Sequence, residues 1–410
     1  MRSRIPLGHL PVFTPEVLRS ERTFLYRRVL DQERRVLGVG EVSVADRPTF
    51  DRDGKVKDWI MGHLTYEALH SIHDLPGNAA QDFPSSHWFV PRWVIEWQGD
   101  EAVLFTLPGD EAAGLAFGQK LKSTQPSAYR PEPIEWTSGT DRDRYLERVD
   151  RFLQHIQRGD IYEVNYCIER TAHQPAFDPF VAFAQLEAGT DAPFSAFYRQ
   201  SDRFVLCASP ERFLAFNGDR VMAEPMKGTR PRGTDPKKDA ELIAELANDP
   251  KERSENIMAV DVMRNDLSMT AAPGTVEVRS LCEVRTYPRV HQLVSAIVSE
   301  RAADRDPWDV VRAAFPMASM TGAPKLRAMQ LIAEAEDQPR GLYSGTLGFF
   351  APDGTADLNV VIRTILFDRA TGDLSLSTGS ALTALCHPAQ EWEECALKAH
   401  SVLNVLGHVG

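Results

Sequence analysis

The clearest periodic pattern of apolar residues follows residue 140. Apolar side chains recur there at i, i+4, i+7 and i+11, at Tyr145, Val149, Phe152 and Ile156. This spacing places them on one face of a helix, and Gly159 follows at a position typical of a helix end. Thr140 and Asp143 resemble a capping box at the other end. The pattern therefore predicts an amphipathic helix between Thr140 and Gly159.

Strand signals occur in two further stretches. Residues 212–225, RFLAFNGDRVMAEP, place Asn-Gly between two apolar runs, and residues 343–378 alternate β-rich runs with Asp-Gly and Thr-Gly-Asp turns. These patterns predict antiparallel hairpins and a meander. Residues 236–268 and 306–336 instead show helical spacing with charged flanks. Strands thus cluster apart from helices, which predicts the α+β class.

The first part of the chain, residues 1–130, predicts a smaller mixed region. A helical segment is expected near residues 16–32, and strands are expected in DWIMGHLTYE, WFVPRWVIEW and EAVLFTL. Residues 122–140 are rich in proline, serine and threonine, which indicates a linker or a long surface loop. A second region then covers residues 140–405.

Composition places the chain among soluble folded proteins. Its 410 residues are 43% hydrophobic and 25% charged, which are ordinary values for a globular protein. With 46 basic and 58 acidic residues, the net charge of −12 argues against a general affinity for nucleic acid or anionic membranes. An anionic substrate would therefore need cations gathered locally.

Cysteine usage and the lengths of apolar runs favour a reducing, cytoplasmic location. No apolar run approaches the roughly 18 residues of a membrane span, and the N-terminal residues lack the apolar core of a signal peptide. The cysteines form no C-x-x-C pair, so neither a disulfide framework nor a zinc site is expected. They are Cys167, Cys207, Cys282, Cys386 and Cys395.

Two pairs of glutamates have i, i+3 spacing in helical segments. Glu252 and Glu255 form one pair, and Glu391 and Glu394 form the other. This spacing stacks two carboxylates on one helical face. Each pair alone is typical of a solvated acidic surface. If the two helices face each other, however, the carboxylates could hold a hard cation such as Mg²⁺.

A lysine in EPMKGTRPRGT, residues 224–234, is a candidate nucleophile. Lys227 lies between a strand and a turn, close in sequence to Arg230 and Arg232. Crowding by cations, or burial, would lower its pKa and leave some free amine. An exposed loop lysine is the alternative interpretation.

Two further positions are candidates for binding an anion. Thr321 is a plausible N-cap, with Pro324 in the first turn, and the N–H groups at that helix end could receive an anion. A plain capped helix explains the same residues. Arg363 stands in the apolar run NVVIRTI, where it needs a carboxylate partner or ligand unless it lies on an exposed edge strand.

Taken together, these segments resemble the chorismate-utilising enzymes, the family that includes anthranilate synthase component I, aminodeoxychorismate synthase component I, and isochorismate and salicylate synthases. The matches run in family order over residues 140–405, whereas residues 1–130 match only loosely through DWIMGHLTYE. The matching stretches are GDIYEVNYCIER, APFSAF, ASPERFL, PMKGTRPRG, ENIMAVDVMRNDLS, FPMASMTGAPKLRAM, RGLYSGTLGFF, LNVVIRTI and the final E-x-x-E segment.

The resemblance implies a fold and a set of residue roles. It implies the anthranilate synthase component I fold, one globular unit with two large antiparallel sheets packed together, helices outside and the site in a cleft. It makes Glu211 the general acid for the C4 hydroxyl of chorismate. It also implies that Mg²⁺ is held by Glu252, Glu255, Glu391 and Glu394, and that substrate is contacted by Tyr343, Arg363, Thr321, Gly379 and Gln292, the first two at the enolpyruvyl carboxylate.

Lys227 distinguishes the branches of the family. The resemblance places this lysine with the aminodeoxychorismate synthases, in which the amine adds at C2 and ammonia then attacks C4 to give 4-amino-4-deoxychorismate for 4-aminobenzoate and folate synthesis. A separate glutamine amidotransferase subunit would supply the ammonia. Anthranilate synthase component I, an isochorismate or salicylate synthase, and a non-catalytic relative are the alternatives.

Three positions depart from the family pattern. Glu163 stands where aminating members have glutamine and water-adding members have lysine, which disfavours water addition at C2. Gln292 replaces the usual histidine, so hydrogen bonding is kept and a titratable group is lost. Ala381 lies in a segment that is richer in glycine in the family, so a different arrangement of backbone donors is expected there.

Overall fold

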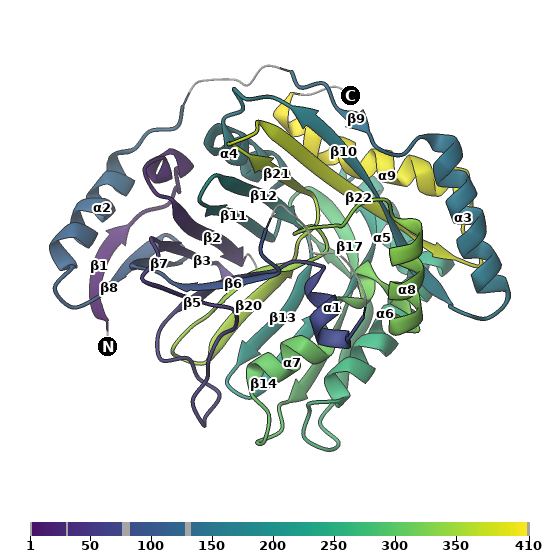
Figure 1. The fold of residues 1–410 in the computed structure, drawn as a ribbon, viewed down its shortest axis with the longest axis horizontal. Coiled ribbons are helices and arrows are strands. Elements are labelled where there is room, and N and C mark those ends of the chain that lie inside the picture. The colour runs from purple at the N-terminus through teal and green to yellow at the C-terminus, as the bar shows by residue number, and fades with distance from the viewer. Residues whose placement is uncertain (1, 30–31, 76–82, 128–132, 408–410) are drawn as a thin grey trace.

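The computed structural model describes residues 2–29, 32–75, 83–127 and 133–407. The described chain forms two antiparallel sheets, one of 12 strands and one of 10, with helices on their outer sides (Figure 1). This arrangement confirms the α+β class that the sequence pattern predicts and the two-sheet architecture that the family resemblance implies.

The larger sheet combines strands from both ends of the chain. Its spatial order is β1 (Ser3–His9), β8 (Glu101–Thr106), β7 (Trp93–Gln98), β3 (Arg34–Val39), β2 (Thr23–Val29), β11 (Phe194–Gln200), β12 (Arg203–Ser209), β21 (Thr364–Asp368), β22 (Asp373–Thr383), β10 (Glu163–His173) and β18 (Gly322–Ala323), with β9 (Thr137–Ser138) beside β10.

The smaller sheet is also assembled from distant segments. Its order is β15 (Met226–Pro231), β17 (Val290–Glu300), β14 (Arg220–Glu224), β13 (Arg212–Asn217), β20 (Thr355–Val360), β19 (Thr346–Phe350), β5 (Ile60–Leu64), β6 (Ser86–Val90) and β4 (Ser43–Ala45), with β16 (Glu277–Thr286) beside β17. Because β2 pairs with β11 and β5 pairs with β19, N-terminal strands are built into both sheets.

The helices vary in length from one turn to five. None in the described part of the chain has the length and apolar character needed to cross a bilayer. They are α1 (Ala68–His73), α2 (Glu111–Ser123), α3 (Arg142–Gln157), α4 (Pro179–Thr190), α5 (Pro236–Asn248), α6 (Pro250–Ser268), α7 (Pro307–Ala314), α8 (Lys325–Ala335) and α9 (Pro388–Leu403), with short 3-10 turns at Pro15–Leu18, Ala318–Met320 and Asn404–Leu406.

Alternating burial along the strands explains how the layers pack. In β2, Phe24 and Tyr26 pack in a cluster that includes side chains of α4, whereas Leu25 packs with Met61 of β5 and Phe349 of β19. Successive side chains of a strand point to opposite faces, so one face of the larger sheet carries helices and the other meets the second sheet. The alternation of side chains along the strands therefore lets the larger sheet pack against helices on one face and against the smaller sheet on the other.

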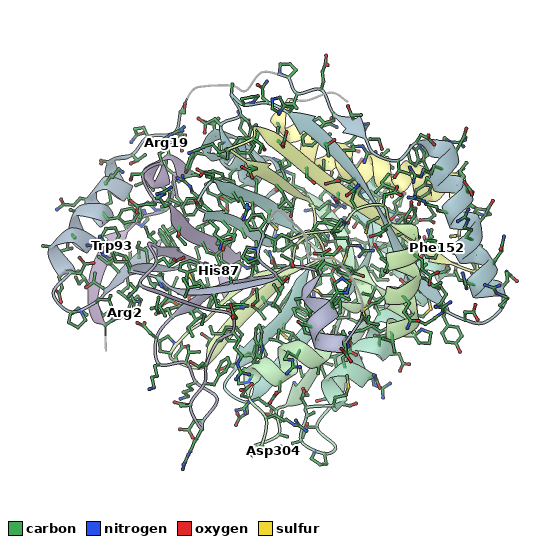
Figure 2. All side chains as sticks on the ribbon, in the orientation of Figure 1. Arg2, Arg19, His87, Trp93, Phe152 and Asp304 are labelled. Atoms are coloured by element: carbon green, nitrogen blue, oxygen red, sulfur yellow. The ribbon has the colours of Figure 1, made fainter. Side chains whose placement is uncertain are left out.

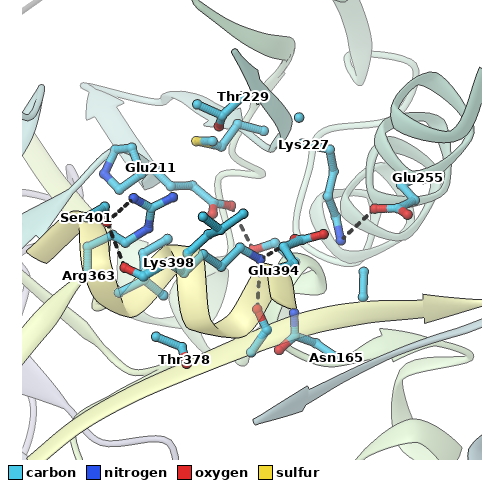
Figure 3. Close-up of a pocket in the computed structure, with 18 of the residues that line it drawn as sticks. Asn165, Glu211, Lys227, Thr229, Glu255, Arg363, Thr378, Glu394, Lys398 and Ser401 are labelled. Atoms are coloured by element: carbon cyan, nitrogen blue, oxygen red, sulfur yellow. Dashed lines mark hydrogen bonds and ion pairs between the residues drawn. The ribbon is translucent and has the colours of Figure 1, made fainter. Parts of the chain in front are cut away.

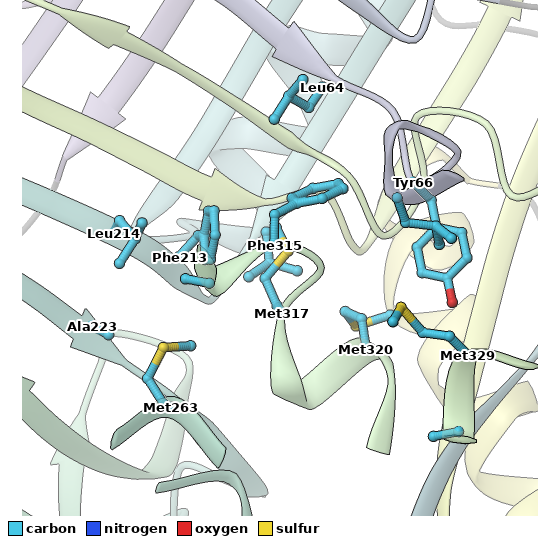
Figure 4. Close-up of a cluster of buried hydrophobic side chains, with 14 of the residues drawn as sticks. Leu64, Tyr66, Phe213, Leu214, Ala223, Met263, Phe315, Met317, Met320 and Met329 are labelled. Carbon is cyan, nitrogen blue, oxygen red and sulfur yellow. The ribbon is translucent and has the colours of Figure 1, made fainter. Parts of the chain in front are cut away.

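The largest apolar cluster joins side chains of α6, α7 and α8 to strands of both sheets. Figure 4 shows methionines from α6, α8 and the segment between α7 and α8 within this cluster, with Met317 beside Phe315 and with Met320 and Met329 beside Tyr66. Methionine fills irregular gaps well because its side chain is unbranched and flexible. The cluster fixes α6, which carries two of the predicted metal ligands.

Most of the elements predicted from sequence are present. The helix after residue 140 is α3, and its first turn is capped by Asp141, whose side chain accepts from the backbone N of Arg144 at 2.8 Å, instead of by Thr140. The helix begins one residue later than the expected capping box requires. The Asn-Gly hairpin is β13 and β14, with Gly218 at φ +63°, and the three N-terminal strand predictions correspond to β5 to β8.

The helix predicted near residues 16–32 is wrong. The short turn Pro15–Leu18 is helical, but strand β2 occupies Thr23–Val29, the middle of the predicted helix. Because β2 is paired on both sides and buried on both faces, its apolar run lacks the alternation that marks a strand. Part of the predicted linker is also regular, since α2 extends to Ser123 and β9 covers Thr137–Ser138. Residues 128–132 lie outside the described part.

A buried network of charges joins the two sheets. Arg27 of β2 binds Asp357 Oδ1 of β20 through Nη2 at 2.7 Å, and Arg212 of β13 binds Asp357 Oδ2 through Nε at 2.8 Å. Arg212 also pairs with Glu224 of β14. All four side chains are at most 5% exposed. Burying such charges is favourable only while each keeps its partners, so the network specifies how β2, β13 and β20 meet.

Replacing Asp357 with alanine should destabilise the fold strongly. Two buried guanidinium groups lose a shared carboxylate, and breaking a buried pair typically costs about 3–5 kcal/mol. Urea unfolding of Asp357→Ala should show this loss. Asp304→Ala, in an exposed loop (Figure 2), should change stability by less than about 1 kcal/mol. Equal midpoints for the two variants would contradict the role of the network.

Candidate active site

A pocket of about 830 Å³ is lined mainly by β15, β22, α6 and α9, together with the segments that carry Glu211 and Arg363. Figure 3 shows polar and charged side chains pointing into it from several directions. Eight of the eleven candidate catalytic, substrate-binding and metal-binding residues line it: Glu211, Lys227, Glu252, Glu255, Tyr343, Arg363, Gly379 and Glu394. The fold therefore brings together residues that are up to 183 positions apart, the separation of Glu211 and Glu394.

Lys227 reaches the pocket through an irregularity in β15. The pairing of β15 with β17 shifts register between Lys227 and Thr229, and Gly228 has φ +73°. The left-handed backbone conformation favours glycine, and a Cβ at residue 228 would lie 2.9 Å from Glu252 Oε2, so a side chain there would displace Glu252. The neighbouring Lys227 side chain extends into the pocket (Figure 3).

The surroundings of Lys227 are acidic. Its Nζ donates to Glu163 Oε1 at 2.6 Å and lies 3.9 Å from Glu255 Oε2. Burial on its own would lower the pKa of Lys227, but the carboxylates of Glu163, Glu255 and Glu211 outweigh burial and raise the pKa above its usual value. The lowered pKa expected from the sequence is therefore wrong, and the side chain rests as an ammonium ion.

The two arginines near Lys227 in sequence do not crowd it because they pair elsewhere. Arg230 donates to Glu245 Oε1 and to Asp249 Oδ2, each at 2.9 Å. Arg232 Nη2 donates to Asp239 Oδ2 at 2.8 Å. The positive charge of both side chains is thus directed at α5 and at the start of α6. The two arginines are close to Lys227 in sequence, but their guanidinium groups pair with carboxylates other than those beside Lys227.

Glu211 occupies the short link between β12 and β13. Its Oε1 accepts a hydrogen bond from Ser319 Oγ at 2.7 Å, and the residue is 5% exposed. Burial raises the pKa of Glu211 to about 7, against the opposing effects of Ser319, Lys227 and Lys398. A carboxyl group with such a pKa carries a proton at neutral pH for about half of the time. It can therefore donate that proton to a leaving group.

Arg363 lies between two sheets instead of within a strand. It follows β20 of the smaller sheet and precedes β21 of the larger one, with φ +52°, a left-handed conformation that is strained for arginine. Its Nη1 donates to Ser401 Oγ of α9 at 2.7 Å, and burial lowers the pKa of its guanidinium. Tyr343, also buried, lines the same part of the pocket. A carboxylate ligand there would meet both side chains.

A lysine that the sequence analysis did not single out lies among the glutamates of α6 and α9. Lys251 Nζ donates to Glu391 Oε1 at 2.8 Å and lies 3.8 Å from Glu255 Oε1 and 4.0 Å from Glu394 Oε2. The two acidic helices therefore face each other across the pocket, as their spacing suggested. Glu391 itself is 1% exposed.

The donor set is consistent with a divalent cation. Glu255 Oε1 and Glu391 Oε2 are buried oxygens that make no hydrogen bond, and carboxylate oxygens are the ligands that Mg²⁺ prefers. In the described ranges no three Asp, Glu, His or Cys side chains converge closely enough to enclose an ion. Glu252 is directed at Arg230, with Oε1 3.6 Å from Nη1. Magnesium binding by these glutamates remains a prediction.

Two other predicted binding residues, Gly379 and Gln292, have different outcomes. Gly379 lines the pocket, and a Cβ there would lie 2.6 Å from Asn165 Oδ1, so a side chain at this position would displace Asn165. Gln292 is buried in β17, and its Oε1 has no hydrogen-bond partner, but the residue does not line the pocket. The segment around Ala381 contributes a further lining residue.

Thr321 is not the N-cap that the sequence suggests. Helix α8 begins at Lys325 with Pro324 as its N-cap residue, and the Thr321 hydroxyl instead donates to the carbonyl of Met317 at 2.9 Å. The side chain is fully buried and lies outside the pocket lining. The helix start was displaced because β18, Gly322–Ala323, pairs with β10 first. Direct contact of Thr321 with a ligand is therefore not supported.

Lys398 is a further cation that sequence reasoning missed. Its Nζ donates to Glu394 Oε1 and to the carbonyl of Gly379, both at 2.7 Å. It follows Glu394 by four residues, which places it on the same face of α9. Spacing on that helix could have identified it. Asn165, Ser319 and Ser401 also line the pocket and carry no sequence signal of their own.

Comparisons with known proteins agree with this geometry. The family model described as chorismate binding enzyme matches residues 22–404. Aminodeoxychorismate synthase component 1 from Salmonella typhimurium is 38% identical over 404 residues, which cover 97% of this chain and 88% of the relative. The solved structure of anthranilate synthase component I from Streptococcus pneumoniae superimposes with a TM-score of 0.74 at 21% identity, covering 98% of this chain and 92% of that one.

Some relatives are much longer than this chain. Aminodeoxychorismate synthase from Streptomyces griseus is 44% identical over 268 residues, which are 65% of this chain but 36% of the relative. The chain therefore matches about a third of that protein.

The titration of Glu211 can be measured directly. Its carboxyl group should lose its proton with a midpoint near pH 7 in infrared difference spectra. Ser319→Ala should move the midpoint upward, since the serine hydroxyl donates to Glu211 and favours the ionised form. Glu255, whose pKa burial also raises to about 7, must be replaced by glutamine in both samples to isolate the signal. A midpoint that Ser319→Ala leaves unmoved or lowers would count against the assigned hydrogen bond.

Proposed function

This chain belongs to the family of chorismate binding enzymes, and we propose that it aminates chorismate at C4 to give 4-amino-4-deoxychorismate. The proposal rests above all on one observation. A buried lysine amine and a buried carboxyl group with a raised pKa, Lys227 and Glu211, line the same pocket and influence each other's pKa. One can act as the nucleophile and the other as the acid for its leaving group.

The first step forms a bond between enzyme and substrate. The Lys227 ammonium passes one proton to Glu163, which already accepts its hydrogen bond at 2.6 Å. The free amine then adds to C2 of chorismate as the C4–O bond breaks, and Glu211 gives its proton to the departing hydroxyl, which leaves as water. The products of this step are a C2–lysine adduct carrying a secondary ammonium, and a Glu211 carboxylate.

The second step releases the lysine. Ammonia attacks C4, and the electron pair of the C2–N bond returns to Lys227, which takes back the proton held by Glu163. The new C4 ammonium loses a proton to Glu211, so both acids regain their resting states. The net change is chorismate plus ammonia to aminodeoxychorismate plus water, with no oxidation or reduction.

Substrate binding uses the cations that the pocket gathers. Chorismate carries two carboxylates, and the chain as a whole has a net charge of −12, so attraction must be local. Arg363 and Tyr343 are assigned to the enolpyruvyl carboxylate, and Lys398 provides a second cation on α9. Bidentate hydrogen bonding by a guanidinium suits a carboxylate, and this supports Arg363 as the anchor.

Magnesium is proposed as the cofactor, held by Glu255, Glu391 and Glu394 with Glu252 beside them. Bound Mg²⁺ would supply positive charge that neutralises the ring carboxylate of the substrate. The buried, unbonded oxygens on Glu255 and Glu391 support this assignment.

Ammonia is proposed to come from a separate glutamine amidotransferase. A glutaminase of the usual kind needs a reactive cysteine, but all five cysteines of this chain are buried, and burial raises the pKa of each thiol. The name of the Salmonella relative, component 1, also implies a partner component for that protein.

Replacing Lys227 with alanine tests the proposed reaction. The purified wild-type chain, given chorismate, Mg²⁺ and an ammonium salt, should release aminodeoxychorismate, identified by mass. Lys227→Ala should lower kcat at least about 100-fold, equivalent to about 2.7 kcal/mol, with little change in chorismate affinity, because metal and carboxylate contacts remain. Lys238→Ala, on the exposed face of α5, is the matched control and should behave as wild type.

Two results would refute the amination reaction or its covalent step. Anthranilate as the main wild-type product would favour the anthranilate synthase reaction instead. An undiminished rate in Lys227→Ala would exclude the lysine adduct.

The source of ammonia gives a separate prediction. The purified chain should use ammonium ions but not glutamine, and addition of a glutamine amidotransferase subunit should confer glutamine-dependent turnover. Release of glutamate from glutamine, measured with and without that subunit, is the assay. Glutamate release by the isolated chain would contradict the proposed division of labour.

A further inference from the structure

Lys251 occupies the centre of the glutamate cluster. It lies in the first turn of α6, just before Glu252, and its Nζ reaches across to α9. Three glutamates contact it within 4.0 Å, namely Glu255 from its own helix and Glu391 and Glu394 from the facing helix. The ammonium therefore occupies the space between the carboxylates that are proposed to hold a metal.

The carboxylates of the cluster repel one another unless a cation offsets their charge. Carboxylates that approach from two facing helices repel one another, and the repulsion is strong where water is excluded. Glu255 and Glu391 have side chains that are 7% and 1% exposed, so water screens them poorly. Lys251 is positioned to offset that repulsion when no metal is bound.

One ammonium ion does not satisfy the cluster completely. Its hydrogen bond goes to Glu391 Oε1, whereas Glu391 Oε2 and Glu255 Oε1 remain buried without a hydrogen bond. An ion with two charges and six coordination positions would neutralise and bind more of these oxygens than a lysine can. The arrangement thus favours replacement of the ammonium by Mg²⁺.

Lys251 also has a route out of the cluster. Its side chain is 35% exposed, in contrast to the glutamates Glu255 and Glu391 around it. The four-carbon stem can carry the ammonium toward solvent by rotation about side-chain bonds, with α6 unmoved. Departure therefore requires no rearrangement of the helix.

We propose that Lys251 is a built-in counter-ion that holds the glutamate cluster together without metal and must be displaced when Mg²⁺ binds. The lysine then sets the affinity of the site for the metal, since every binding event includes breaking its contacts. This inference rests on the magnesium site of the proposed function. It identifies Lys251 as a residue that competes with Mg²⁺ for the glutamates proposed to bind the metal.

Titration of the purified full-length chain with Mg²⁺ alone tests the exchange. Calorimetry should show that Lys251→Met, which keeps the apolar stem and removes the charge, binds Mg²⁺ at least about tenfold more tightly than wild type. Lys251→Arg, which keeps a cation, should bind no more tightly than wild type, and Lys238→Met, on the exposed face of α5, should match wild type. Equal affinity in Lys251→Met and wild type, or an absence of Mg²⁺ binding by both, would overturn the exchange.

Thermal unfolding in a chelator tests the counter-ion role independently of activity. Lys251→Met should melt at a lower temperature than wild type in the chelator, and Mg²⁺ should restore it. If Lys251→Met folds only when Mg²⁺ is added, that result also supports the counter-ion role. An unchanged melting temperature in the chelator would overturn the role of Lys251.

The product assay separates this inference from the proposed reaction. If wild type forms no aminodeoxychorismate but the three variants bind Mg²⁺ as stated, the reaction assignment fails and the exchange stands. If wild type forms the product while Lys251→Met gains no affinity, the exchange fails and the reaction stands.

Discussion

The pocket depends on compensation of buried carboxylates by lysines. Lys227 pairs with the buried Glu163 at 2.6 Å and Lys251 with the buried Glu391 at 2.8 Å, and Lys398 pairs with the partly exposed Glu394 at 2.7 Å. Removing such charges from water is costly, and it is offset only where the pairing is close. The Lys227 pair joins β15 to β10 and the Lys251 pair joins α6 to α9, so the same contacts that neutralise the charges hold the walls of the pocket in place. A substrate or metal that enters must replace contacts of the same kind.

The sequence predicts the fold well where a signal is local. The Asn-Gly turn of β13 and β14 depends on two residues and their backbone conformation, and α3 depends on a repeated spacing. Prediction from sequence fails where the conformation of a segment depends on pairing with strands that are distant in sequence. Thr23–Val29 forms a strand because β3 pairs with it on one side and β11 on the other. Strand β11 is distant from it in sequence, so a local pattern carries no sign of this pairing. The start of α8 was likewise set by pairing of Gly322 with Val164 of β10.

The site shows the same division between local and distant information. The glutamate pairs could be predicted because i, i+3 spacing determines which side chains share a helical face. The state of Lys227 could not, since the carboxylate that binds it belongs to Glu163, 64 residues away. Arg363 was expected within a strand, but it lies where the chain passes from one sheet to the other, and its left-handed backbone conformation is set by both. Residues at such crossings carry no periodic signal.

Glu163 shows how one departure from a family pattern acquires a physical meaning. A glutamine at this position could accept a hydrogen bond from Lys227 but could not take its proton. The carboxylate can, across a single 2.6 Å contact between side chains that are 5% and 10% exposed. In a site so poorly accessible to water, a neutral amine beside a neutral carboxylic acid avoids the desolvation cost of two buried charges. This lowers the free energy needed to convert the resting ion pair into the reactive free amine. The raised pKa of Lys227 is therefore compatible with nucleophilic attack, because the acceptor for its proton is already in contact with it.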